Sequence, residues 1–106
     1  MQTIIIRNDK GIQAYDVSNI IRIKGMSNYC KIFFADNRRP LTVAKVLHWF
    51  QDNLPAEMFW RTHKTHLVNS MYIQTMVTSL KPHVVLQSGE LVSVSRRRAK
   101  QFKAIA

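Results

Sequence analysis

The sequence predicts one mostly β domain with helical additions, and three observations support this fold class. Short β-branched runs alternate with clusters of turn-forming residues, and one longer stretch has apolar residues at helical spacing. Apolar residues make up 46% of the 106 residues, which is enough for a hydrophobic core at this length. Only three glycines and three prolines occur, and we find no repeat or linker, so residues 1–106 are expected to form a single domain.

The first half of the chain contains strand-like segments separated by polar turns. The expected strands cover residues 3–7, 11–15, 17–25 and 29–34. The run Asn8-Asp9-Lys10-Gly11 between the first two is rich in turn formers and predicts a hairpin. The polar loop Met26-Ser27-Asn28 joins the next two, and a turn at residues 36–40 ends this part of the chain.

Residues 41–54 have a different periodicity and predict an amphipathic helix. The apolar positions on its expected inner face are Val43, Val46, Leu47, Phe50 and Leu54. Thr42 is the expected N-cap because its hydroxyl can accept a backbone N–H bond. Pro55 follows Leu54 and stops the helix.

The second half returns to strands and ends in a second helix. The expected strands cover residues 59–61, 73–80, 83–87 and 91–94. Ser88-Gly89-Glu90 joins the last two as a hairpin turn. Ser95 is expected to cap a final helix in which Ala99, Phe102 and either Ile105 or Ala106 pack inward.

The charge indicates a polyanionic partner. Lys and Arg number 16 against 6 Asp and Glu, which gives a net charge of +10, and the pI is near 10.4. Such a surface attracts nucleic acid first and acidic membranes second. We find no membrane-spanning stretch and no signal peptide, so no membrane partner is expected. A single cysteine, Cys30, suits a reducing compartment, and we expect a cytoplasmic location.

The densest polar segment covers residues 61–69, RTHKTHLVN, with two cations, two histidines and two hydroxyls beside apolar anchors. Such side chains suit phosphate and guanine contacts, although a solvated loop in which Asn69 caps a turn fits the pattern equally well. His63 and His66 would share a helical face, but the segment has no acid and its cations disfavour a dication. We therefore expect no metal site.

A second basic segment covers residues 95–103 at the expected start of the final helix. Cations there meet the positive end of the helix dipole, yet the exposed N–H groups favour phosphate. An anionic partner would resolve this conflict, whereas the alternative is a basic surface without a partner. The short segment could also lie on a membrane surface, for which it is poorly suited.

An enzyme is not expected. The six acids are Asp9, Asp16, Asp36, Asp52, Glu57 and Glu90. They lie mostly in predicted turns or at helix ends, and no carboxylate pair suited to acid–base catalysis is evident. Cys30 lies inside an expected strand, where a buried structural thiol is the common outcome. No glycine-rich phosphate loop accompanies it, and the sequence indicates no cofactor.

Several motifs, in order along nearly the whole chain, resemble those of LytTR DNA-binding domains, the output modules of many bacterial response regulators. They are DVSNIIRIKGMSNY (16–29), Leu41-Thr42, Phe59 followed by THKTHLVN (62–69), Ile73, and LQSGELVSVSRRR (86–98). The resemblance implies an elongated stack of small antiparallel sheets with one amphipathic helix and a short C-terminal helix. It also implies DNA binding by loops that enter successive major grooves and bend the duplex.

The resemblance further implies individual roles. Asn28, Lys64 and Arg97 match base-contacting positions, and their side chains suit adenine and guanine edges. The expected phosphate contacts are Arg61, His63, Thr65, Arg96, Arg98 and Lys100. Asn69 is expected to brace its loop and not to contact a base.

The family also suggests an organisation. Its response regulators have an N-terminal receiver domain, and only Met1-Gln2 precede Thr3 here, so we expect an excised output domain or a stand-alone protein. Two copies are expected on direct repeats of double-stranded DNA, where they could form a homodimer. The leading hypothesis is a bacterial transcriptional regulator that binds specific sequences. The alternatives are an RNA-binding module or a module for acidic partners.

Overall fold

The computed structural model describes residues 2–104 and confirms a mostly β architecture. Its strands are β1 (Thr3–Asn8), β2 (Gly11–Asp16), β3 (Ile20–Met26), β4 (Tyr29–Phe34), β5 (Leu41–Val43), β6 (Phe59–His63), β7 (His66–Asn69), β8 (Ile73–Val77), β9 (His83–Leu86) and β10 (Leu91–Ser93). Its α-helices are α1 (Leu47–Asn53) and α2 (Arg96–Lys103), and its 3-10 turns are η1 (Val17–Asn19) and η2 (Ser70–Tyr72).

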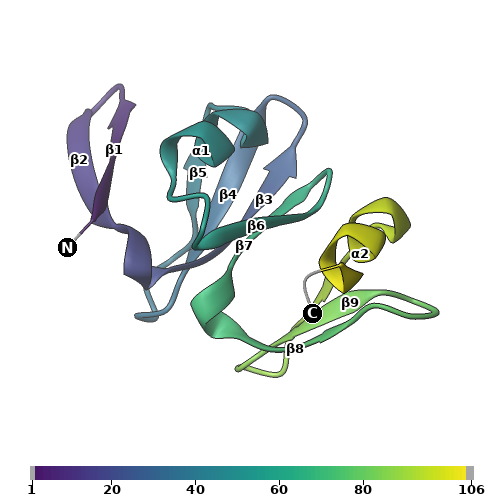
Figure 1. The fold of residues 1–106 in the computed structure, drawn as a ribbon. Coiled ribbons are helices and arrows are strands. Elements are labelled where there is room, and N and C mark those ends of the chain that lie inside the picture. The colour runs from purple at the N-terminus through teal and green to yellow at the C-terminus, as the bar shows by residue number, and fades with distance from the viewer. Residues whose placement is uncertain (1, 105–106) are drawn as a thin grey trace.

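The strands form three antiparallel sheets that follow one another along an elongated molecule (Figure 1). Strands β1 and β2 form a hairpin, the central sheet has the order β5-β4-β3-β7-β6, and the last sheet has the order β10-β9-β8. The principal extents of 44 × 26 × 21 Å give the long shape that the family resemblance implies. Within residues 2–104, neither helix is long and apolar enough to cross a bilayer.

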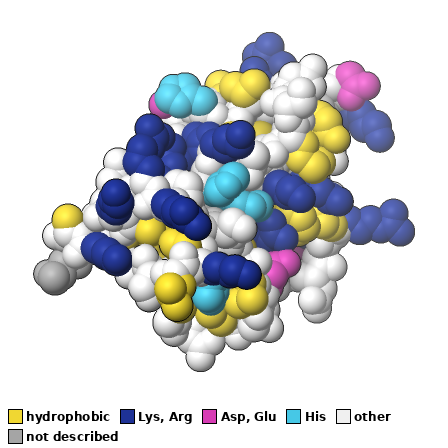
Figure 2. Space-filling model, turned by 90° about the vertical axis from the view of Figure 1, so that its right-hand side faces the viewer, with side chains coloured by type: hydrophobic (Ala, Val, Ile, Leu, Met, Phe, Trp, Pro, Cys, Tyr) yellow, Lys and Arg dark blue, Asp and Glu magenta, His cyan; other side chains and the backbone are white. Residues whose placement is uncertain are grey.

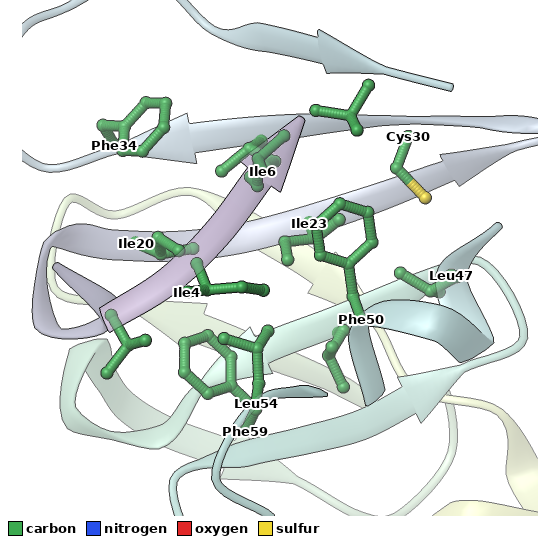
Figure 3. Packing of buried hydrophobic residues seen from close by; sticks show 14 residues of the cluster. Ile4, Ile6, Ile20, Ile23, Cys30, Phe34, Leu47, Phe50, Leu54 and Phe59 are labelled. Carbon is green, nitrogen blue, oxygen red and sulfur yellow. The ribbon is translucent and has the colours of Figure 1, made fainter. Parts of the chain in front are cut away.

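The larger hydrophobic core lies between the β1–β2 hairpin, the central sheet and α1. Ile4 and Ile6 of the hairpin, Ile23 of β3 and Phe50 of α1 are buried in it. Figure 3 shows the Phe50 ring pointing from α1 toward Ile23. Cys30 is fully buried in the same core, and burial raises the pKa of its thiol, so the expectation of a structural cysteine is confirmed.

A smaller core joins the last sheet to α2. Its buried residues are Val68, Val84, Leu86, Val92, Val94 and Ala99. Val68 belongs to the central sheet, so the two cores meet at β7. Arg22 of β3 also ties the sheets together, because it donates to both carboxylate oxygens of Glu90 at 3.0 Å.

The helix predicted over residues 41–54 is wrong in its first half. Residues Leu41–Val43 form strand β5, in which Val43 pairs with Cys30 of β4, and α1 begins only at Leu47. Thr42 is therefore not the N-cap; Val46 is, without a side-chain hydrogen bond, and it is exposed. The edge of β4 supplies backbone partners for β5, and this long-range pairing outweighs the local helical periodicity.

Other boundaries shift for similar reasons. The segment predicted as a strand over residues 17–25 begins with η1, where the Asp16 carboxylate accepts the Ser18 N–H at 2.9 Å. The strand expected over 73–80 ends at Val77, and residues 61–69 form most of a hairpin. Both predicted hairpins, β1–β2 and β9–β10, are confirmed.

The C-terminal helix is confirmed with its cap. The Ser95 hydroxyl accepts the Arg98 N–H at 3.3 Å, and Ala99 is buried. The Phe102 ring stacks on Trp60 of β6 with centroids 5.5 Å apart. The predicted packing of Ile105 or Ala106 lies outside the described residues.

Candidate nucleic-acid interface

Two turns that the sequence places far apart lie side by side at one end of the central sheet. Strand β3 pairs with β7, with Lys24 opposite His66, and the Gly25 N–H donates to the Thr65 carbonyl at 2.8 Å. The β3–β4 turn presents Asn28 and the β6–β7 turn presents Lys64, and both side chains are exposed. Two of the three predicted base-contacting residues therefore come from neighbouring turns.

The Arg61 side chain holds the β6–β7 turn through hydrogen bonds to its backbone. Its Nε donates to the His63 carbonyl at 2.9 Å, and its Nη2 donates to the Lys64 carbonyl. Its Nη1 donates to the Gln51 side chain of α1 at 2.7 Å. Burial, with the nearby Arg98 charge, lowers the pKa of Arg61. Arginine side chains stay protonated in proteins. Arg61 thus fixes the backbone on both sides of Lys64 and keeps only its remaining N–H groups for a ligand.

His63 is oriented by Thr65 across the same turn. The His63 Nδ1 accepts the Thr65 backbone N–H at 3.2 Å and lies 2.9 Å from the Thr65 hydroxyl. Because Nδ1 accepts a hydrogen bond, the neutral ring has its proton on Nε2. The geometry therefore leaves an N–H donor on the side of the ring away from the turn.

The start of α2 is docked on β6. Thr62 is fully buried; its hydroxyl donates to the Ser93 carbonyl at 3.1 Å, and its own carbonyl accepts the Ser95 N–H at 2.8 Å. Arg98 Nη1 donates to the Arg61 carbonyl at 3.3 Å. These contacts place Arg97, the third predicted base-contacting residue, on an anchored helix start with its side chain exposed.

The predicted site residues lie along one side of the molecule. Figure 1 shows the β3–β4 turn, the β6–β7 turn and α2 on the same side, and Figure 2 shows Lys and Arg side chains gathered around histidines on that face. Within residues 2–104 the ion pairs are Arg22–Glu90, Arg38–Asp36 and His48–Asp52. Since none includes Lys64, Arg96, Arg97 or Lys100, this face keeps its positive charge for a ligand.

The sequence did not predict that α1 borders this face. A hollow beside the two turns is lined by Ser27, Arg61, Lys64 and, from the first turn of α1, His48. His48 is exposed, and its Nε2 lies 3.3 Å from the Oδ2 of Asp52. Its nearness to Lys64 depends on how α1 packs across the sheet, for which no local sequence signal exists.

The sequence did not predict the environment of His66 either. His66 lies opposite His63 across the hairpin, with ring centroids 5.6 Å apart, and not on a shared helical face. Its Nδ1 is buried without a hydrogen-bond partner among the described residues. Burial, with the charges of His63, Arg22 and Lys24 opposed only by Glu90, lowers the pKa of His66 from 6.5 to about 4.

This low pKa gives a testable pH dependence of stability. Between pH 6.5 and about 4 the unfolded chain binds a proton at His66 that the folded chain does not, so stability should fall as the pH falls through this window. His66→Gln should flatten this part of a urea-unfolding profile measured by circular dichroism. The control is His83→Gln, because His83 makes only an exposed hydrogen bond to the Lys81 carbonyl. This variant should keep the wild-type slope of stability against pH. An unchanged slope in His66→Gln would contradict the assignment.

Together the fold and the face define a basic, mostly β nucleic-acid-binding domain. The family model described as the LytTr DNA-binding domain matches residues 10–106, so the chain belongs to the LytTR family of DNA-binding domains. Among solved structures, a domain from Bacillus cereus described as the LytTr DNA-binding domain of a methyl-accepting/DNA response regulator has the same fold. It superimposes with a TM-score of 0.80 at 19% identity, covering 99% of this chain and 96% of that one. No curated protein gives a significant sequence match.

Proposed function

We propose that this domain binds specific sequences of double-stranded DNA through the β3–β4 turn, the β6–β7 turn and the start of α2, as a bacterial transcriptional regulator. The observation that supports this most directly is the position of Asn28, Lys64 and Arg97 on one cationic side. The β3–β4 and β6–β7 turns lie side by side and suit one groove, and the separate start of α2 suits a further contact along the duplex.

The two turns and the start of α2 have side chains that distinguish bases. An amide such as that of Asn28 pairs with the N6 and N7 of adenine, whereas Lys64 and Arg97 suit the O6 and N7 of guanine. Hydrogen bonds to backbone carbonyls on each side of Lys64 limit the motion of its turn. The cap and the Thr62 contacts do the same for Arg97. Such preorganisation reduces the entropy lost on binding.

The surrounding donors are proposed to contact phosphates. Exposed Arg96 and Lys100 are suited to this directly, and His63 through its Nε2. Thr65, Arg61 and Arg98 are partly engaged in the turn and the helix start, so they combine bracing with phosphate contacts. We further propose that two copies occupy direct repeats and form a homodimer on DNA.

A competition experiment separates this function from its alternatives. We expect a fluorescently labelled duplex bound by the protein to be displaced by an unlabelled duplex of the same sequence at concentrations where single-stranded RNA and anionic vesicles are ineffective. Fluorescence anisotropy measures the displacement. More effective competition by RNA would support the RNA-binding alternative, and displacement by vesicles alone would support a module for acidic surfaces.

Phosphate contacts should be recognisable by their salt dependence. Lys100→Ala should weaken binding to all duplexes alike and reduce the slope of log K against log salt by about one. Lys10→Ala, in the β1–β2 turn at the other end of the molecule, removes the same charge and should leave the slope unchanged. Equal slopes for wild type and Lys100→Ala would exclude this contact.

A further inference from the structure

The connection between β8 and β9 presents the most exposed large apolar side chain of the described chain. Leu80 is 92% exposed, whereas the next most exposed, Ile12 and Leu91, are each 64% exposed. Leu80 also has a φ of 58°, in the left-handed region that favours glycine or asparagine. The exposed apolar side chain and the left-handed backbone conformation of Leu80 are therefore both unfavourable in the isolated domain. This combination points to a contact made with a partner.

The chain anchors this tip next to the start of α2. The Val94 N–H donates to the Pro82 carbonyl at 3.2 Å, and Ser93 pairs with His83. Leu80 lies two residues before Pro82, and Arg97 lies three residues after Val94, so both project from one anchoring point. Figure 1 shows the β8–β9 connection beside α2 on the side that holds the predicted DNA contacts.

The surroundings of Leu80 include two cations, Lys81 and Arg96. An open hollow is lined by Val77, Ser79, Leu80, Lys81, His83 and Arg96. The His83 Nδ1 donates to the Lys81 carbonyl at 2.8 Å, which ties the turn to β9, the strand that follows it. Within residues 2–104, neither Lys81 nor Arg96 belongs to an ion pair. An apolar tip that shares a hollow with cations outside any ion pair suits a polyanion that also offers apolar surface.

Duplex DNA has both properties, since phosphates flank grooves whose base steps accept apolar wedges such as leucine. Resting on the DNA-binding function proposed above, we propose that the β8–β9 turn is a further DNA contact. In this contact Leu80 inserts at a base step in the minor groove flanking the base pairs contacted by Arg97. Lys81 binds a phosphate beside that step. The contact would extend the site beyond the two turns and the helix start that the family pattern indicated.

The test uses a high-affinity duplex in which 2-aminopurine replaces single bases outward from the Arg97 contact. Binding of the wild-type domain should raise 2-aminopurine fluorescence at one flanking step, because unstacking relieves quenching. Leu80→Ala should abolish the rise and weaken binding by about tenfold, since an apolar contact of leucine size is lost. Leu80→Met keeps a flexible apolar side chain, so it should restore most of the fluorescence rise and most of the affinity.

Controls separate this contact from the fold and from the proposed function. Ala and Leu are equally disfavoured at a φ of 58°, so Leu80→Ala changes the side chain and not the backbone demand. Ile12→Ala removes another exposed apolar residue, in the β1–β2 hairpin, and should bind as wild type.

The outcomes are distinct. If Leu80→Ala matches wild type in affinity and fluorescence while Arg97→Ala loses its base preference, the β8–β9 contact is overturned and the proposed function stands. If wild type prefers no duplex over any other, both proposals are overturned together.

Discussion

Arg97→Ala is expected to lose discrimination at one base pair of the bound sequence, by about 1 to 3 kcal/mol, or roughly fivefold to more than a hundredfold. The physical reason is that a guanidinium can donate two parallel hydrogen bonds to the O6 and N7 of guanine, and alanine offers neither. Lys64→Ala should relax preference at a different pair, because its turn lies at the end of the central sheet and not on α2.

The measurement is the affinity of each variant for duplexes in which every base pair of the preferred site is changed in turn. Arg7→Ala removes one exposed cation from the β1–β2 hairpin and is the matched control for charge. It should keep the wild-type preference at all positions. If Arg97→Ala and Lys64→Ala instead weaken all duplexes by equal factors, these residues contact phosphates and base recognition lies elsewhere.

Asn69→Ala should reduce the free energy of unfolding by about 3 kcal/mol, the largest effect expected on stability from one polar side chain here. Asn69 is fully buried at the end of β7. Its amide donates to the Ile20 carbonyl at 2.9 Å, and its oxygen accepts the Met71 N–H at 3.0 Å to cap η2. The substitution would leave both backbone groups unpaired where water has little access.

Urea unfolding followed by tryptophan fluorescence measures this loss. Asn53→Ala removes an exposed amide that donates to the Trp49 carbonyl at 2.8 Å, and it should cost no more than about 1 kcal/mol. Since Asn69 lies at the opposite end of β7 from Lys64, the folded variant should keep its base preference. A loss of preference without a loss of stability would mean that Asn69 acts at the DNA and not in the fold.

Much of the fold could be predicted from local pattern. The two confirmed hairpins follow from turn formers between apolar runs, and the C-terminal helix follows from Ser95 and the inward positions Ala99 and Phe102. The start of α1 could not be predicted, because Val43 satisfies helical spacing and strand burial equally well. The decision rests on pairing with β4, a contact between residues that are distant in sequence.

The sequence predicted which types of residue form the site, but it predicted less of how they are arranged in space. The cations of segments 61–69 and 95–103 could be identified from the sequence. Their placement on one face depends on buried Thr62, because its two hydrogen bonds attach the start of α2 to β6. Nothing in the local pattern marks a threonine as such a tie. The dual role of Arg61 was also hidden, because its carbonyl partners at His63 and Lys64 exist only once the hairpin has formed.

Selection of bound duplexes from a random DNA pool tests the central claim most directly. The affinity of the selected duplex is compared with that of a scrambled duplex at about 50 and 200 mM salt, where phosphate contacts alone can change affinity by about a thousandfold. We predict enrichment of a short repeated motif whose preference over the scrambled duplex survives at the higher salt. A pool that stays random, with binding to both duplexes lost equally in salt, would contradict sequence recognition by this face.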